Sequence, residues 1–269
     1  MLLLLLSASA VRTQDLAPAL ADRFSDGVAA LKAGQLYVAE ATFRGVLRAG
    51  GTRAFVHHNL GIVLQLRGRH LDALSEFRAA TAIDRAFGPS RLLAGTSLLA
   101  LGRTREAVTE LERAVQLMPK EPSAFLQLAD ACERAGDLIC LVDAYRSAVS
   151  LVPEEAEYAY RLGKAYLKLS QSSYARIRAI DPRAARLSQA LGLEYLQQGR
   201  PDLAESAFQA AVQRDPSLTG AHLALAQIYL AGGRLDDAAR AIARELAIEP
   251  ESRAARDVQA AIAAARQHM

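Results

Sequence analysis

Small and apolar positions recur with helical spacing between Gly88 and Glu121. Residues three to four positions apart share one side of an α-helix, and a first series with this spacing consists of Ala94, Gly95 and Leu98. Gly102 then supplies a turn signal. A second series follows the turn and ends at a proline; it consists of Ala107, Leu111, Ala114 and Pro119. The pattern predicts two antiparallel helices in a unit of 34 residues.

The same pattern recurs when the chain is shifted by 34 residues. The mid-helix position of Gly95 is occupied in other copies by Gly27, Gly61, Ala129, Gly192 and Ala226. The turn position of Gly102 is occupied by Gly34, Gly68, Gly136, Gly199 and Gly233. The large residue of the second helix, Leu111, is matched by Phe43, Phe77, Tyr145, Phe208 and Ile242. Agreement of many copies in one register indicates a repeat protein, because chance agreement falls steeply with each added copy.

This pattern closely resembles the tetratricopeptide repeat, in which a small residue in helix A is followed by a turn and then by Ala, a large residue, Ala and Pro. The resemblance implies an all-α fold, an α-solenoid of antiparallel helix hairpins with about six to seven repeats. Each hairpin of a solenoid contacts only its neighbours, so the core grows with every added unit.

The chain divides into six segments on this reading. A signal peptide at 1–10 and a linker at 11–19 precede four repeats at 20–155. An irregular, shortened repeat at 156–184 separates these from two further repeats at 185–252, and a capping helix at 253–269 ends the array. We expect the solenoid to change direction at the irregular repeat.

The irregular repeat allows two structures. Either residues 170–173, all serine or glutamine, form a tight turn with a serine N-cap, or one helix runs from about Tyr158 to Ile180. An apolar stripe stays roughly in phase across the serines, which favours the continuous helix. When the repeat is aligned backwards from Pro182, Tyr174 falls at the position of the large residue in helix B, the second helix of the hairpin.

An apolar run followed by Ala8, Ser9 and Ala10 opens the chain and is typical of a secretory signal cleaved after Ala10. The run is short and has no preceding basic residue, as a truncated or wrongly assigned start would give. It is far too short to span a bilayer, so we expect no stable membrane span. Export to a periplasmic or extracellular location is expected if this segment is a signal peptide, and a cytoplasmic location otherwise.

The chain has two cysteines, Cys132 and Cys140, on the two helices of one hairpin. Their separation around a tight turn allows a disulfide, for which an exported protein would meet oxidising conditions. Alternatively, both are small buried residues, the interpretation that the sequence favours slightly.

Composition and motifs argue against an enzyme. The 32 basic and 29 acidic residues are scattered and give a net charge of +3, so no basic stripe marks a nucleic-acid partner. Nucleotide-binding, zinc-protease and serine-hydrolase motifs are absent from the sequence. The adjacent His57 and His58 point about 100° apart on a helix, which disfavours a shared metal. We therefore expect no catalytic residues, no metal and no cofactor.

The resemblance implies that helix A of each repeat lines a concave groove for an extended peptide or a partner helix. Five residues share one offset, three positions before the small residue, and are candidates for lining that groove: Phe24, His58, Leu92, Leu126 and Tyr160. Some relatives hold a carboxylate with Lys, Arg and Asn at such positions. Four of the five residues here are apolar, which favours an apolar ligand segment. The alternative is that these side chains pack between helices.

The sequence is therefore interpreted as a scaffold that binds a protein or peptide partner. Two other classes stay open. One is a module that self-associates or assembles an envelope complex, with a homo-oligomer as its product. The other is a helical regulatory subunit of a separate enzyme.

Overall fold

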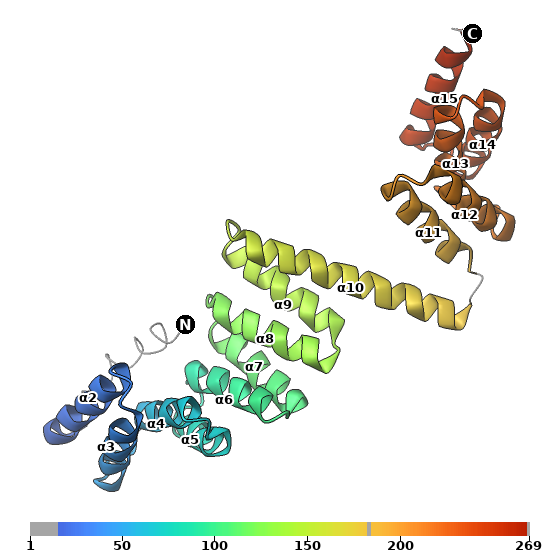
Figure 1. Cartoon of the computed structure of the whole chain (residues 1–269). Helices are drawn as coiled ribbons and strands as arrows, with labels where there is room; N and C mark the ends of the chain where they lie inside the picture. The colour runs from blue at the N-terminus through green and yellow to red at the C-terminus, as the bar shows by residue number, and fades with distance from the viewer. Residues whose placement is uncertain (1–15, 182–183, 268–269) are drawn as a thin grey trace. The chain divides into compact units, whose positions relative to one another are not determined.

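A computed structural model describes residues 16–181 and 184–267 of the chain. Those residues form fourteen α-helices joined by short turns, which confirms the predicted all-α solenoid of hairpins (Figure 1). The predicted signal peptide and its cleavage site after Ala10 lie outside the described residues. The chain divides into two compact units, Met1–Leu169 and Ser170–Met269.

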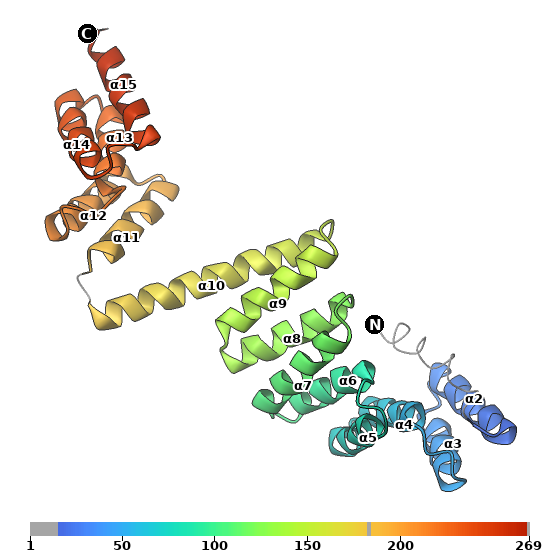
Figure 2. The ribbon, with the colours of Figure 1, turned by 180° about the vertical axis from the view of Figure 1, so that it is seen from behind.

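Over residues 16–169, the first unit contains eight complete helices. These are α2 (Pro18–Lys32), α3 (Leu36–Arg48), α4 (Ala54–Leu66), α5 (His70–Ile83), α6 (Gly88–Ala100), α7 (Thr104–Leu117), α8 (Pro122–Ala135) and α9 (Leu138–Leu151). Successive helices pack against one another as antiparallel hairpins (Figure 2). Helix α10 (Ala156–Ile180) follows as one continuous helix, without the turn at residues 170–173 that the sequence also allowed. The boundary between the two units falls within α10.

Over residues 184–267, the second unit continues with five helices. They are α11 (Ala185–Gln197), α12 (Pro201–Arg214), α13 (Ala221–Ala231), α14 (Leu235–Ile248) and α15 (Arg253–Gln267). Two hairpins are followed by α15, which packs on both α13 and α14 and buries Ala255 and Ile262. Helix α15 therefore covers one side of the preceding hairpin.

In the four hairpins whose first helix (helix A) has a glycine at mid-helix, a large side chain of the second helix (helix B) packs into the notch beside that glycine. A β-carbon built on Gly61 of α4 would lie 2.5 Å from a ring carbon of Phe77 in α5, closer than two such atoms can approach. Gly27, Gly95 and Gly192 face Phe43, Leu111 and Phe208 in the same way. The glycine spacing of the sequence therefore reflects close helix packing, with the large residue 16 positions after each of these glycines.

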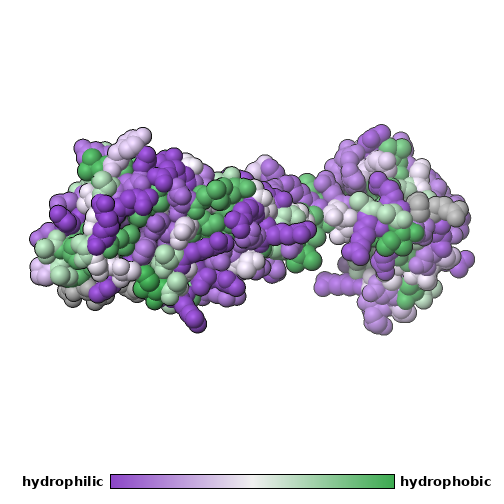
Figure 3. Space-filling view, turned by 90° about the horizontal axis from the view of Figure 1, so that it is seen from below, coloured by the Kyte–Doolittle hydropathy of each residue, from purple (hydrophilic) through white to green (hydrophobic). Residues whose placement is uncertain are grey.

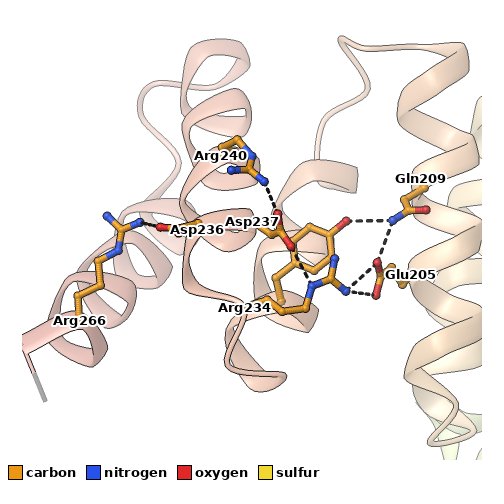
Figure 4. A network of polar contacts seen from close by, with 8 residues as sticks. Glu205, Gln209, Arg234, Asp236, Asp237, Arg240 and Arg266 are labelled. Atoms are coloured by element: carbon orange, nitrogen blue, oxygen red, sulfur yellow. Dashed lines mark hydrogen bonds and ion pairs between the residues drawn. The ribbon is translucent and has the colours of Figure 1, made fainter. Parts of the chain in front are cut away.

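Ion pairs tie successive hairpins together at their turns. In the second unit, Arg234 at the start of α14 donates to both carboxylate oxygens of Glu205 in α12, at 3.0 and 2.9 Å, and to Asp237, at 2.9 Å (Figure 4). The Arg234 guanidinium also lies 4.2 Å from the centre of the Tyr229 ring. In the first unit, Arg69 contacts Glu40 of the preceding hairpin in the same manner. Such contacts fix the spacing of neighbouring hairpins.

Candidate functional site

A cavity of about 280 Å³ lies at the end of the first unit, among α8, α9 and the first half of α10. Its lining combines aromatic, acidic and basic side chains: Glu133, Leu141, Tyr145, Glu157, Tyr160, Arg161, Lys164, Ala165 and Lys168. Of the chain's four lysines, two line this cavity. On the face that Figure 3 shows, hydrophilic and hydrophobic residues are interspersed.

One wall of the cavity is held by the α8–α9 hairpin. Gly136 ends α8 with a φ of 73°, which glycine adopts without strain, and the Asp137 carboxylate accepts a hydrogen bond of 3.0 Å from the Cys140 N–H at the start of α9. A disulfide joins Cys132 to Cys140 across this turn, with their Cα atoms 5.8 Å apart. The α8–α9 wall is therefore held both by the disulfide and by the capping hydrogen bond of Asp137.

The other wall is a charged face of α10. Glu157, Arg161, Lys164 and Lys168 follow one another at spacings of four, three and four residues, which places them on one side of the helix. Arg161 donates a hydrogen bond of 2.6 Å to Glu157. This hydrogen bond is the main reason that the pKa of Arg161 is raised. Lys168 pairs with Glu133 of α8.

The balance of charge in the cavity is positive. Three cations face two carboxylates, and the remaining cation, Lys164, has its ammonium 5.6 Å from the centre of the Tyr160 ring. The Tyr160 side chain is 62% exposed at the edge of the cavity, whereas Tyr145 is buried in its floor. The arrangement offers a charged donor for an incoming carboxylate and an aromatic surface for apolar atoms next to it.

The structure corrects the prediction for three of the five groove residues. Phe24, His58 and Leu92 are buried in the core. The Phe24 ring lies 5.0 Å from that of Phe55 and 5.5 Å from that of Phe43, so it fills the junction between two hairpins. Side chains at this position of the repeat point toward the next hairpin. Where that hairpin packs on them, they are buried between helices and do not line a groove.

His58 is buried between hairpins in the same way, although its ring is polar. It lies between Phe77 and Phe87, and its Nδ1 is 2.9 Å from the Ser90 hydroxyl. Burial lowers its pKa to about 4, so the ring is neutral at ordinary pH. Its Nε2 has no hydrogen-bond partner. This histidine is a core residue rather than a binding residue.

The other two candidates differ from these. Leu126 is half-buried against the core, whereas Tyr160 on the first half of α10 is exposed. Tyr160 alone among the five therefore lines the cavity. Its neighbours in the cavity, Arg161, Lys164 and Lys168, were not predicted as site residues from the sequence. The sequence did contain a signal for this cluster. The three basic residues are spaced so that they share one face of a helix, and lysine is rare in the chain.

The apolar start of α9 is mostly covered. Leu141 and Val142 are buried, Leu138 is half-buried, and Ile139 is 67% exposed beside a shallow hollow of about 500 Å³. Within residues 16–181 and 184–267, no cluster of His, Cys, Asp or Glu is arranged to hold a metal ion. In the same ranges, none of the helices has the length and apolar character needed to cross a membrane.

Comparisons with known proteins agree with the repeat pattern. Family models described as tetratricopeptide repeats match residues 52–120 and residues 190–254. The chain is a tetratricopeptide repeat protein. Among solved structures, a tetratricopeptide repeat protein from Parabacteroides merdae has a TM-score of 0.51 at 13% identity and covers 92% of this chain and 100% of that one. PilF of Pseudomonas aeruginosa has a TM-score of 0.48 at 18% identity, covering 90% and 97%.

One curated relative of this tetratricopeptide repeat protein is Cellulose synthase operon protein C of Xanthomonas axonopodis pv. citri. The two sequences are 28% identical over 235 residues, which is 79% of this chain. The match spans only 16% of that relative's length.

Proposed function

We propose that this tetratricopeptide repeat protein is a non-catalytic scaffold that binds an acidic peptide segment of a partner protein at the α8–α10 cavity. The observation that carries the proposal is the gathering of Arg161, Lys164 and Lys168 beside the exposed ring of Tyr160 in one cavity. The repeat family supports it at the level of fold, because hairpin arrays present extended surfaces for peptides.

The charges of the cavity favour a carboxylate ligand. Arg161 and Lys168 already pair with Glu157 and Glu133, so an added carboxylate would restore neutrality next to Lys164. The contacts that raise the pKa of Arg161 keep its guanidinium charged. A charge-assisted hydrogen bond to such a group is stronger than a neutral one, and Tyr160 would pack against the apolar part of the same residue.

Fluorescence anisotropy with two labelled peptides tests the proposal. One peptide is rich in Glu and ends in a free carboxylate, and the other has Gln in place of Glu and ends in an amide. We expect the chain to bind the acidic peptide and to lose affinity as salt rises. The double charge reversal Lys164→Glu/Lys168→Glu should weaken binding by roughly tenfold or more.

The chain offers a matched control for this experiment. Lys32→Glu/Lys120→Glu reverses the same number of charges at exposed positions of the same unit, outside the cavity. Equal losses in the two double variants would show that binding follows net charge, and equal binding of both peptides would contradict recognition of carboxylates. The same variants, immobilised beside the unchanged chain, would then identify the partner by mass spectrometry of retained host proteins.

Export is part of the same proposal. The apolar run before Ala10 supports it, and so does the Cys132–Cys140 disulfide, since disulfides persist in oxidising compartments. Amino-terminal sequencing of the protein purified from the envelope fraction of its host should begin at Val11. A protein recovered only from the cytosol with its first residues intact would contradict export.

A further inference from the structure

Gly163 in α10 lies at the position of the glycine notch of a helix A, but no side chain of the described residues fills the space beside it. In the hairpins that begin with α2, α4, α6 and α11, a β-carbon built on the equivalent glycine would collide with a Phe or Leu of helix B at 2.5 to 2.8 Å. The same atom built on Gly163 meets nothing within 4 Å. The residue 16 positions later is Ala179, which lies further along the same helix.

The face of α10 around this notch is exposed and uncharged. Ala159, Gly163, Tyr166 and Ser170 recur at helical spacing on it, and Tyr160 and Leu167 border it. Tyr160, Tyr166 and Leu167 are 62%, 46% and 59% exposed. In the regular hairpins, helix B covers the corresponding face of helix A. This half of α10 therefore has the surface of a helix A without its helix B.

The second half of α10 carries the complementary pattern. Ser170, Tyr174 and Ile177 have the spacing that Ala73, Phe77 and Ala80 have in α5, where Phe77 fills the notch at Gly61. Tyr174 is 39% exposed. Eleven residues separate Gly163 from Tyr174 along one continuous helix, a distance of roughly 16 Å. Tyr174 therefore cannot reach the notch of its own chain.

We propose that α10 pairs antiparallel with α10 of a second copy of this chain, so that each Tyr174 enters the Gly163 notch of the other. The pairing reproduces between chains the contact that Gly27, Gly61, Gly95 and Gly192 make with a large side chain of their own hairpin. Because Gly163 and Tyr174 exchange roles, the contact is self-complementary and has a two-fold axis at the level of Lys168 and Leu169.

The charges on α10 favour a second copy over a charged partner helix. Arg161, Lys164 and Lys168 lie roughly 100° or more around the helix from Gly163, on the side of the cavity described above. The pairing therefore keeps these three cations away from their copies in the other chain, and the cavity stays on the other side of α10. The inference does not depend on the proposed peptide binding.

Cysteine cross-linking of the full chain tests the antiparallel contact. Cys132 and Cys140 are bonded to each other, and no other cysteine is present in the chain. In the variant Ala159→Cys/Arg178→Cys, which keeps Gly163 and Tyr174, the two new thiols lie far apart along one helix and cannot bridge within it, so mild oxidation should give a dimer on a non-reducing gel. Glu157→Cys/Arg176→Cys has the same spacing on the opposite side of α10 and should stay monomeric. Equal cross-linking of the two variants would overturn the proposal.

Sedimentation equilibrium gives a second, independent readout. The unchanged chain should approach twice its monomer mass as its concentration rises. Tyr174→Ala should weaken this association by roughly tenfold or more, because a buried aromatic anchor is removed. Tyr37→Ala, at a 77% exposed tyrosine of α3, should leave it unchanged. Circular dichroism establishes that both variants are folded. A monomer at every concentration, or a dimer that Tyr174→Ala does not weaken, would overturn the proposal.

Discussion

The carboxylate of Glu245 in α14 accepts a hydrogen bond of 2.6 Å from the backbone N–H of Gly220, which precedes α13. It accepts a second bond, of 3.2 Å, from the N–H of Leu223. Glu245 is only 1% exposed, and its buried charge satisfies the amino terminus of α13, which has no capping side chain of its own. A polar residue thus stands where the repeat pattern has a small one.

Removing this cap should destabilise the second unit. Glu245→Ala leaves two backbone N–H groups without their acceptor and loses the favourable charge at a helix start, so we expect a loss of about 2 kcal/mol in the free energy of unfolding. Urea denaturation followed by circular dichroism measures it. Glu249→Ala, at an exposed position near the end of the same helix, is the control. Similar losses in both variants would contradict a capping role.

Gly61 and Gly163 should respond in opposite directions to the same substitution. Gly61→Ala forces a methyl group against the buried Phe77 ring and should cost about 1 to 3 kcal/mol of stability. Gly163→Ala meets open space and should gain up to about 1 kcal/mol from helix propensity. Thermal unfolding of dilute protein compares them. Destabilisation by Gly163→Ala under these conditions would mean that the notch is filled within the single chain.

Acid should weaken the fold through His58. Its pKa is lowered to about 4 in the folded chain, against an ordinary value near 6.5, so only the unfolded chain takes up the proton between these values. Stability should therefore fall as pH drops from about 6.5 to about 4, by roughly 3 kcal/mol from this residue. Urea denaturation across this range should show a flatter profile for His58→Leu/Ser90→Ala. His222→Leu is the control, and an unchanged profile in the double variant would count against this role.

Reduction of the disulfide should loosen the wall of the cavity. Cys132 and Cys140 close a short loop, so their bond restricts the unfolded chain by about 2 kcal/mol. Cys132→Ala/Cys140→Ala should lower the free energy of unfolding by this amount, as should dithiothreitol acting on the unchanged chain. Dithiothreitol should have no effect on the double variant. If dithiothreitol leaves the free energy of unfolding of the unchanged chain the same, the disulfide does not contribute to stability.

The repeat architecture could be predicted because its contacts are local. A notch such as Gly61 and the ring that fills it, Phe77, belong to one hairpin, so their fixed separation is visible in the sequence. The positive φ of the turn glycines, such as 73° at Gly68, is local in the same way. A pattern that repeats every 34 residues therefore specified the hairpins, their turns and the class of fold.

The environment of each side chain was decided by the neighbouring hairpins. Phe24 and Tyr160 occupy the same position of the repeat, yet the first is buried because Phe55 of the next hairpin packs on it, and the second is 62% exposed. The cavity draws on three helices, and Glu245 caps a helix that begins more than twenty residues earlier. Sequence alone determined which hairpins form, since their interactions lie within one repeat. Only the tertiary structure decided which faces stay open, since burial depends on what packs beyond the repeat.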